Sequence, residues 1–238
     1  MMSRGSCTVV YARAVAFPLF ALVFAPLASA QGFLFGGKAG VSITQYFETG
    51  VAEAPTYRAE YSAATRRYTF GPSAEWRITR AFGFEVDALY HRMGYVAILD
   101  TFSTSQGAST RSAIDVKGNS WDFPLVAKYR FSGAVRPYLI GGGVLRHVGP
   151  VRGRGEVIVQ NSMSATTSRT VLDTTQPSEL RKRLYPGVIA GGGVEFGADR
   201  FRVLPEIRYT RWTANISVQG GLLRFESNQV EFLIGVLF

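Results

Sequence analysis

Residues capable of acid–base or nucleophilic chemistry are few in this chain. It contains two histidines, His91 and His147, and one cysteine, Cys7. A serine–histidine pair with an acidic neighbour could hydrolyse lipid esters, because histidine activates a hydroxyl as a general base. No nucleophile motif surrounds either histidine, and two isolated histidines make a poor zinc site. We therefore expect no catalytic residue, no metal site and no cofactor.

Two glycine clusters, at 141–143 and 191–193, invite interpretation as phosphate-binding loops. A phosphate loop needs a helix that presents its N-terminus to the anion, and no helical pattern follows either cluster. Glycine inside a strand instead leaves room for large neighbours or allows sharp coiling of the sheet. We interpret both clusters as structural.

Charge at alternating positions is the stronger chemical signal. Successive side chains of a strand point to opposite faces, and several segments place their charges on the face opposite the aromatic residues. Rolled into a closed sheet, such segments would bring the charges together inside it. The expected interior charge network comprises Glu75, Arg77, Glu85, Asp87, Lys128, Arg130, Arg202, Glu206, Arg208 and Glu231. Buried charges persist when they are partnered, so we expect paired ions and trapped water to fill the interior.

The elements that must position these charges are eight strand-like segments. They lie at about 33–47, 67–79, 82–96, 120–131, 135–148, 186–198, 201–214 and 229–238. Short turns fall near 80–81, 132–134 and 199–200, whereas long polar links fall near 48–66, 97–118, 149–185 and 215–228. Short turns on one side and long loops on the other are typical of outer-membrane barrels. The pattern predicts an all-β fold, an eight-stranded antiparallel up-and-down transmembrane β-barrel.

The N-terminal 30 residues have the pattern of a secretory signal peptide. Arg4 and Arg13 precede or flank an apolar run, and Ala28-Ser29-Ala30 matches the small-residue cleavage site. Cleavage there would leave residues 31–238 as the barrel domain, without cysteine and thus without disulfides. Loss of the two arginines lowers the formal net charge from +9 to +7. For a secreted chain this charge favours anionic lipid over nucleic acid as a partner.

A soluble lipocalin-like barrel, with its apolar face inward, is the alternative fold. Alternation alone does not separate the two, because a soluble barrel could carry the same charges outside. The cysteine-free mature chain, the density of aromatic residues and the terminal Phe238 favour the membrane. In that setting only a closed barrel satisfies the backbone of a chain without long apolar runs.

The pattern as a whole resembles the small eight-stranded outer-membrane barrel family that includes OmpA-type membrane domains. The resemblance covers residues 31–238, and its clearest carriers are Arg136-Pro137-Tyr138 with the glycine run after it, and the segment 232–238. It implies location in the outer membrane of a Gram-negative-type bacterium. It also implies that Phe232, Ile234, Val236 and Phe238 form a C-terminal signal read by the assembly machinery. No peptidoglycan-binding domain follows the barrel, so that role of longer relatives is not carried over.

Aromatic and basic residues suggest how the barrel meets its surroundings. Amphipathic rings favour the head-group boundary, which suits two aromatic girdles built from residues near the strand ends. The candidates are Trp76, Tyr90, Tyr95, Trp121, Tyr129, Tyr138, Tyr209 and Trp212, of which Trp212 has inward parity. The basic residues of the third link, Arg152, Arg154, Arg181, Lys182 and Arg183, are possible contacts for lipopolysaccharide phosphates.

We expect a monomeric, non-catalytic protein with a structural or surface-interaction role, presenting four long loops outside the cell. A narrow passive channel is the alternative, because the interior network could open and pass small ions or solutes. A lipid-modifying enzyme is a third possibility.

Overall fold

The computed structural model describes residues 32–103, 107–133, 135–161, 163–175, 184–198, 201–213, 217–218 and 223–238. Fourteen strands lie in these residues. They are β1 (Phe33–Ser42), β2 (Gly50–Ala54), β3 (Tyr57–Ala63), β4 (Arg66–Arg77), β5 (Phe82–Asp87), β6 (Leu89–Ser103), β7 (Ala108–Arg130), β8 (Arg136–Asn161), β9 (Thr166–Thr175), β10 (Leu184–Ala198), β11 (Phe201–Trp212), β12 (Ser217–Val218), β13 (Leu223–Arg224) and β14 (Asn228–Leu237). The expected signal peptide lies outside the described residues and stays a prediction.

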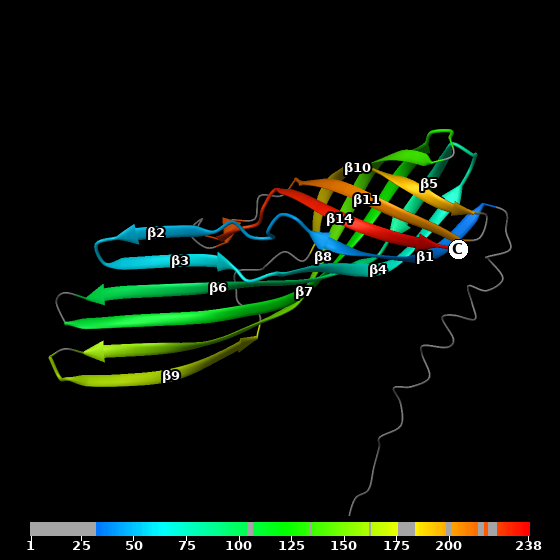
Figure 1. Ribbon diagram of the computed structural model, residues 1–238. Helices are drawn as coiled ribbons and strands as arrows, with labels where there is room; N and C mark the ends of the chain where they lie inside the picture. The colour runs from blue at the N-terminus through cyan, green and yellow to red at the C-terminus, as the bar shows by residue number, and fades with distance from the viewer. Residues whose placement is uncertain are drawn as a thin grey trace, which may run out of the picture.

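Eight of the strand positions close into an antiparallel barrel (Figure 1). Around its wall the order is β1, β4, β5 with β6, β7, β8, β10, β11 and β14. β14 returns to β1 with Gly36 opposite Leu237, so the sheet has no free edge in this part. The predicted eight-stranded up-and-down barrel is confirmed.

The third wall position is made of two strands, β5 and β6, that meet at Ala88. Both pair with β4 on one side and β7 on the other, so they act as one barrel strand with a local break. The Ala88 amide still donates to the Pro72 carbonyl at 3.0 Å, which keeps the wall continuous. The sequence predicted one uninterrupted segment here because its alternation continues through the break.

Three barrel strands run far past the barrel and form a second region, the outer sheet (Figure 1). In it the distal parts of β6, β7 and β8 continue side by side, flanked by β3 and β2 at one edge and β9 at the other. The expectation of polar links without strands was therefore wrong for residues 48–66 and 97–118. In the third link, β8 and β9 form a hairpin in which Asn161 lies opposite Thr166.

The two faces of the barrel wall differ as the alternation predicts. The outward face carries exposed apolar side chains such as Leu125, Ile207 and Leu139, at 61%, 54% and 56% exposure. The inward face carries buried charged residues, among them Lys128 and Arg208 at 0%. This is the arrangement of a barrel whose outside meets hydrocarbon. The described part of the chain contains no helix long and apolar enough to cross a membrane.

Candidate functional site

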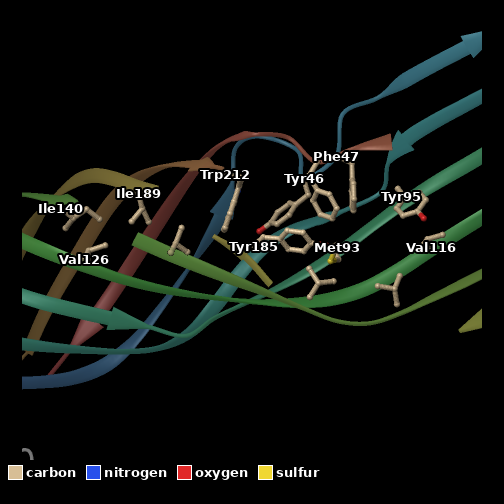
Figure 2. Close-up of a cluster of buried hydrophobic side chains, with 14 of the residues drawn as sticks. Tyr46, Phe47, Met93, Tyr95, Val116, Val126, Ile140, Tyr185, Ile189 and Trp212 are labelled. Atoms are coloured by element: carbon tan, nitrogen blue, oxygen red, sulfur yellow. The ribbon is translucent and has the colours of Figure 1, made fainter. Parts of the chain in front are cut away.

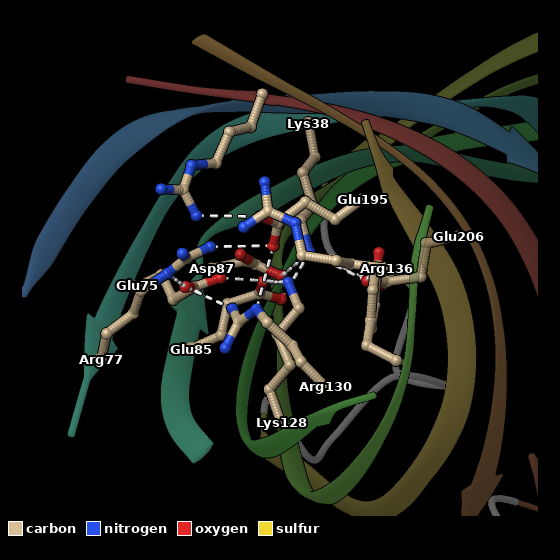
Figure 3. A network of polar contacts seen from close by, with 12 residues as sticks. Lys38, Glu75, Arg77, Glu85, Asp87, Lys128, Arg130, Arg136, Glu195 and Glu206 are labelled. Carbon is tan, nitrogen blue, oxygen red and sulfur yellow. Dashed lines mark hydrogen bonds and ion pairs between the residues drawn. The ribbon is translucent and has the colours of Figure 1, made fainter. Parts of the chain in front are cut away.

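A network of ions occupies the middle of the barrel (Figure 3). Glu85 of β5 lies at its centre: Lys128 Nζ is 2.7 Å from Glu85 Oε2, and Arg208 Nη2 is 2.9 Å from Glu85 Oε1. Lys38 also pairs with Glu85 and is 3.4 Å from Glu206 Oε2. All these side chains are fully buried. In a low-dielectric interior each charge is tolerated because it has opposite charges on several sides.

Strand register explains how distant residues meet in this network. Arg208 leans across the lumen to Asp87 Oδ2 at 2.7 Å, and also contacts Glu206, two residues away on β11. Lys128 reaches a second carboxylate, Glu75 of β4, at 3.1 Å. Lys128 therefore joins the central group to a second group nearer the turn end of the barrel.

The second group surrounds two acidic residues, Glu75 and Glu195. Arg77 binds both, with Nε 2.6 Å from Glu75 and Nη2 2.8 Å from Glu195. Arg130 also bridges them, donating from Nε to Glu195 at 2.9 Å and pairing with Glu75. Two more arginines, Arg202 at 2.8 Å and Arg136 at 3.5 Å, contact Glu195. Figure 3 shows these side chains converging from opposite walls. The lumen at this level is filled by paired charge.

Glycines make the space that the long inward side chains occupy. A Cβ on Gly193 would lie 2.6 Å from the Tyr138 hydroxyl and 2.3 Å from the Pro205 carbonyl oxygen, so any side chain there would collide. Tyr138 uses that space to donate to Glu206 at 2.8 Å, with Lys128 Nζ 4.2 Å from its ring centroid. Gly235 similarly lies beside the Lys38 stem. Gly193 and Gly235 thus leave room for the side chains of the charge network.

A separate polar cluster lies nearer the outer mouth, centred on Arg146 of β8. Its guanidinium binds Asp122 through two hydrogen bonds of 2.7 Å and Gln229 through one of 2.8 Å. It is held between two rings, with centroids at 4.6 Å for Tyr46 and 4.1 Å for Trp212. Charge-assisted, bidentate and stacked contacts of this kind fix an arginine in one orientation.

His91 completes this mouth cluster. Its Nε2 is 3.2 Å from Asp122 Oδ2, and its Nδ1 faces both the Tyr46 hydroxyl and Glu231, the latter at 3.7 Å. Thr69, the nearest hydroxyl on Nε2, is 3.4 Å away. Burial raises the pKa of the Tyr46 hydroxyl, which lies in the connection after β1, so that it stays a neutral group. His91 is thus enclosed by hydrogen-bonding partners at 1% exposure.

Further aromatic residues lie beside the rings of the mouth cluster; Figure 2 shows Phe47, Tyr95 and Tyr185 near Tyr46. Phe47 forms an isolated β-bridge with Phe225, and their rings are 4.5 Å apart. The ring centroids of Tyr95 and Phe47 are 5.3 Å apart, and those of Tyr185 and Phe225 are 5.8 Å apart. We call Phe47, Tyr95, Tyr185 and Phe225 the mouth plug; all are at least 94% buried. The plug, the mouth cluster and the two ion groups together fill the lumen.

The structure places all ten residues of the expected interior network on the inward face. Nine of them belong to the two ion groups described above, and Glu231 belongs to the mouth cluster beside His91. The network also contains five charged residues that the expected set omits: Lys38, Asp122, Arg136, Arg146 and Glu195. Lys38, Asp122 and Glu195 share the polar parity of their strands, so alternation could have found them. Arg146 lies on the segment whose alternation is poorest.

The aromatic girdles differ from the expectation in three residues. Tyr95, Tyr138 and Trp212 point inward and are buried at 1%, 1% and 7% exposure, so their assignment to a girdle was wrong. Each fills the lumen or its mouth, where a ring has a hydrogen-bonding or stacking partner. The remaining five candidates face outward: Trp76, Tyr90, Trp121, Tyr129 and Tyr209.

The other predicted sites are placed as follows. Arg152 and Arg154 lie exposed on β8, whereas 181–183 lies outside the described residues. In the C-terminal segment, Phe232, Ile234, Val236 and Phe238 share the outward face of β14 and its end. Phe238 exchanges two backbone hydrogen bonds with Phe35, of 2.8 and 3.0 Å. Among the described residues, no group of three His, Cys, Asp or Glu side chains could hold a metal ion.

Comparison with known proteins identifies the family of the chain. Residues 28–212 match the family described as "Outer membrane protein beta-barrel domain". The chain belongs to this family. It is accordingly a protein of the bacterial outer membrane, in the Gram-negative envelope.

Solved structures of this kind are also similar, at low identity. Neisserial surface protein A is 16% identical over 87% of this chain and 96% of its own, with a TM-score of 0.37. OprG of Pseudomonas aeruginosa is 11% identical over 87% and 96%, with a TM-score of 0.41. The outer membrane protease OmpT of Escherichia coli is 8% identical over 88% and 95%, with a TM-score of 0.37. No curated protein matches.

Proposed function

We propose that this protein is a non-catalytic outer-membrane barrel with a structural and surface-interaction role, and that its lumen is closed to ions and solutes. The observation that carries the proposal is the filled interior. Ion pairs with 0% side-chain exposure join strands that are not neighbours in the wall, such as Arg208 of β11 with Glu85 of β5 and Lys38 of β1 with Glu206 of β11. An eight-stranded barrel is only wide enough for its own side chains.

Opening such a lumen would require breaking several ion pairs together. Lys128 contacts Glu75 and Glu85, while Glu85 contacts Lys38 and Arg208 as well. Removing one partner of a buried pair leaves the other uncompensated and costs about 3–5 kcal/mol. The network therefore supports a rigid plug rather than a gate that fluctuates at thermal energies.

The surface role is supported by the outer sheet, which carries many exposed charged side chains. Its outer face bears twelve charged residues, whereas the described interior charges are enclosed. The twelve charged residues on the outer face of the described sheet are Glu53, Arg58, Glu60, Asp100, Arg111, Asp115, Lys117, Arg152, Arg154, Glu156, Arg169 and Asp173. We propose that the protein meets its partners through this sheet, that lipopolysaccharide is one of them, and that the protein works as a monomer.

The C-terminal segment has a role during insertion in this proposal. Its outward side chains, Phe232, Ile234, Val236 and Phe238, are accessible from the lipid side of β14 before the barrel closes on β1. We propose that the assembly machinery of the outer membrane reads them there.

Planar-bilayer recording tests the closed lumen. Folded wild-type protein should show no discrete conductance steps, and a variant with part of the plug removed, Lys128→Ala with Phe47→Ala, should show them if it still folds. Steps in the wild type that disappear with Arg208→Lys would instead establish the narrow channel. Mass analysis of lipid A from expressing cells provides the matching test for catalysis: an altered acyl or phosphate pattern would contradict the non-catalytic role.

A further inference from the structure

A band of basic residues lies on the outward surface at the outer end of the barrel, on β4, β6, β7 and β8. Arg66 of β4 is directly opposite Arg92 of β6, and Lys117 of β7 is directly opposite Arg152 of β8. Arg92 is in turn opposite Asn119, two residues from Lys117 on β7. We call Arg66, Arg92, Lys117 and Arg152 the basic band. Like charges directly opposite one another destabilise a sheet, so their juxtaposition requires an explanation.

The rows of the outer sheet farther from the barrel do not share this feature. One row across the strands reads Glu53, Arg58, Asp100, Arg111, alternating in sign. The row nearest the basic band reads Asp115, Arg154, Asp173, also alternating, with Arg154 Nε 3.4 Å from Asp173. The row between these two carries Glu60 and Glu156, which are not opposite each other, and Glu156 pairs with Arg169. In none of these rows do two like charges stand directly opposite each other. The basic band is the exception within the described outer sheet.

Acidic neighbours are scarce in the basic band. Lys117 pairs with Asp115 on its own strand. Within the described residues Arg66, Arg92 and Arg152 have no acidic side chain within ion-pair distance. Three guanidinium groups thus remain available, and a guanidinium matches the geometry of phosphate by donating two parallel hydrogen bonds.

The height of the band in the membrane identifies its ligand. Just below the band lies a continuous row of outward rings. The ring centroids of Phe70 and Tyr90 are 5.3 Å apart, and those of Tyr90 and Trp121 are 5.5 Å apart. Such rings mark the head-group boundary. Arg92 is two residues beyond Tyr90 on β6, about 7 Å farther along a strand that is tilted in the wall, and so a few ångströms beyond the ring row. That is the level of lipid head-group phosphates, and the hydroxyl of Tyr90 is held there by Asn119 at 2.7 Å.

We infer that the basic band is a binding site for the phosphates of a lipopolysaccharide molecule whose acyl chains lie against Phe70, Tyr90 and Trp121. This deepens the surface role proposed above. It assigns the contact to residues of three barrel strands in addition to Arg152, and it excludes Arg154, whose charge is matched by Asp173. The anion would relieve the repulsion between Arg66 and Arg92, so the ligand would be part of the stable structure in the membrane.

The test compares two triple variants with equal loss of charge. The site variant is Arg66→Gln, Arg92→Gln and Arg152→Gln. The matched control is Arg111→Gln, Arg154→Gln and Arg169→Gln, three arginines of the same sheet whose described partners are Asp100, Asp173 and Glu156. Each folded protein is incubated with purified lipopolysaccharide in detergent, and bound lipid per barrel is measured by native mass spectrometry. Heat-modifiable gel mobility verifies folding.

We expect the site variant to bind lipopolysaccharide at least about tenfold more weakly than wild type, equivalent to about 1.4 kcal/mol. The control should bind within about twofold of wild type, because its arginines are already neutralised. Lipopolysaccharide with its lipid A phosphates removed should bind all three proteins weakly and equally. Equal binding by site variant and control, or undiminished binding of the dephosphorylated lipid, would overturn the assignment.

Two further arms keep the outcomes distinct. Inorganic phosphate at millimolar concentration should compete poorly, since it lacks the acyl chains; full competition would show a site for free phosphate and refute the lipid. Bilayer recording of the site variant should remain silent. Conductance there would contradict the closed lumen without bearing on the basic band, so the two proposals fail independently.

Discussion

The barrel and the outer sheet share strands but place their charges on opposite faces. On β7, Lys128 and Asp122 point into the lumen, whereas farther out Asp115 and Lys117 point to the outside. The inward face of the outer sheet carries no charge in its described residues, only side chains such as Leu99 and Ile114. The difference shows that the surroundings decide: where lipid bathes the outside, charge is placed inside, and where water bathes the outside, charge returns to it.

On β8 the reversal has a visible backbone cause. The register between β7 and β8 shifts between Gly118 and Ser120, where β8 contains one extra residue. Before the shift Arg146 points inward, and after it Arg152 and Arg154 point outward although all three are even-numbered. A bulge re-aims the side chains that follow it. This single bulge therefore lets β8 point its arginines into the lumen within the barrel and to the outside in the outer sheet.

Removing a cation from each region should give the largest contrast. Lys128→Met leaves Glu75 and Glu85 without a main partner, and should lower the free energy of unfolding by about 3–5 kcal/mol. Lys117→Met, on the exposed face, should change it by less than about 1 kcal/mol. Urea titration in detergent, followed by tryptophan fluorescence, measures both. Similar losses for the two variants would refute the contrast.

Adding a cation to the apolar outward surface should separate the regions in the opposite sense. Leu125→Arg exposes charge to hydrocarbon and should cost about 2–4 kcal/mol if the site lies near the bilayer centre. Val171→Arg, on the equally exposed outer sheet, should cost no more than about 0.5 kcal/mol. Reversible unfolding in lipid vesicles gives the two values. A tolerated Leu125→Arg would place the barrel wall in water.

A smaller effect is expected from filling the space beside Tyr138. Gly193→Ala places a methyl group against the Pro205 carbonyl and the Tyr138 hydroxyl, and should destabilise by about 1–3 kcal/mol through overpacking. Gly141→Ala is the control, because its nearest heavy atom would be 4.0 Å away. Thermal midpoints from gel mobility compare them. If Gly193→Ala left the thermal midpoint unchanged, the packing around Tyr138 would be looser than these distances indicate.

The smallest global effect should come from Phe47 of the mouth plug, which lies in the connection after β1 and in no strand of either region. Phe47→Ala should leave the unfolding midpoint of the barrel nearly unchanged and raise hydrogen exchange around residues 43–49 by about tenfold or more, because local opening costs less than global unfolding. Phe102→Ala, an exposed ring on the outer sheet, serves as the control. Unchanged exchange at 43–49 would show that Phe47 does not close the mouth.

Alternation predicted the barrel because one repeating rule applies to every wall strand. It could not predict partners, since Lys38 meets Glu206 through a register set by the whole closed sheet. The mouth plug was also beyond reach: Phe47 and Phe225 come from connections that carry no period. The outer sheet was missed for a related reason. Its faces contrast charged with small or apolar residues such as Ala59, so it resembles a polar link more than an amphipathic strand.

The pairing of β1 with β14 has a consequence for biogenesis. Gly36 finds its neighbour Leu237 only after about 200 intervening residues have been delivered. Contacts so remote along the chain form slowly, because the entropy of joining the ends is lost before any reward is gained. Until that seam is sealed, two unpaired rims would face hydrocarbon. A catalyst that held both rims together would therefore shorten the slowest step of closure.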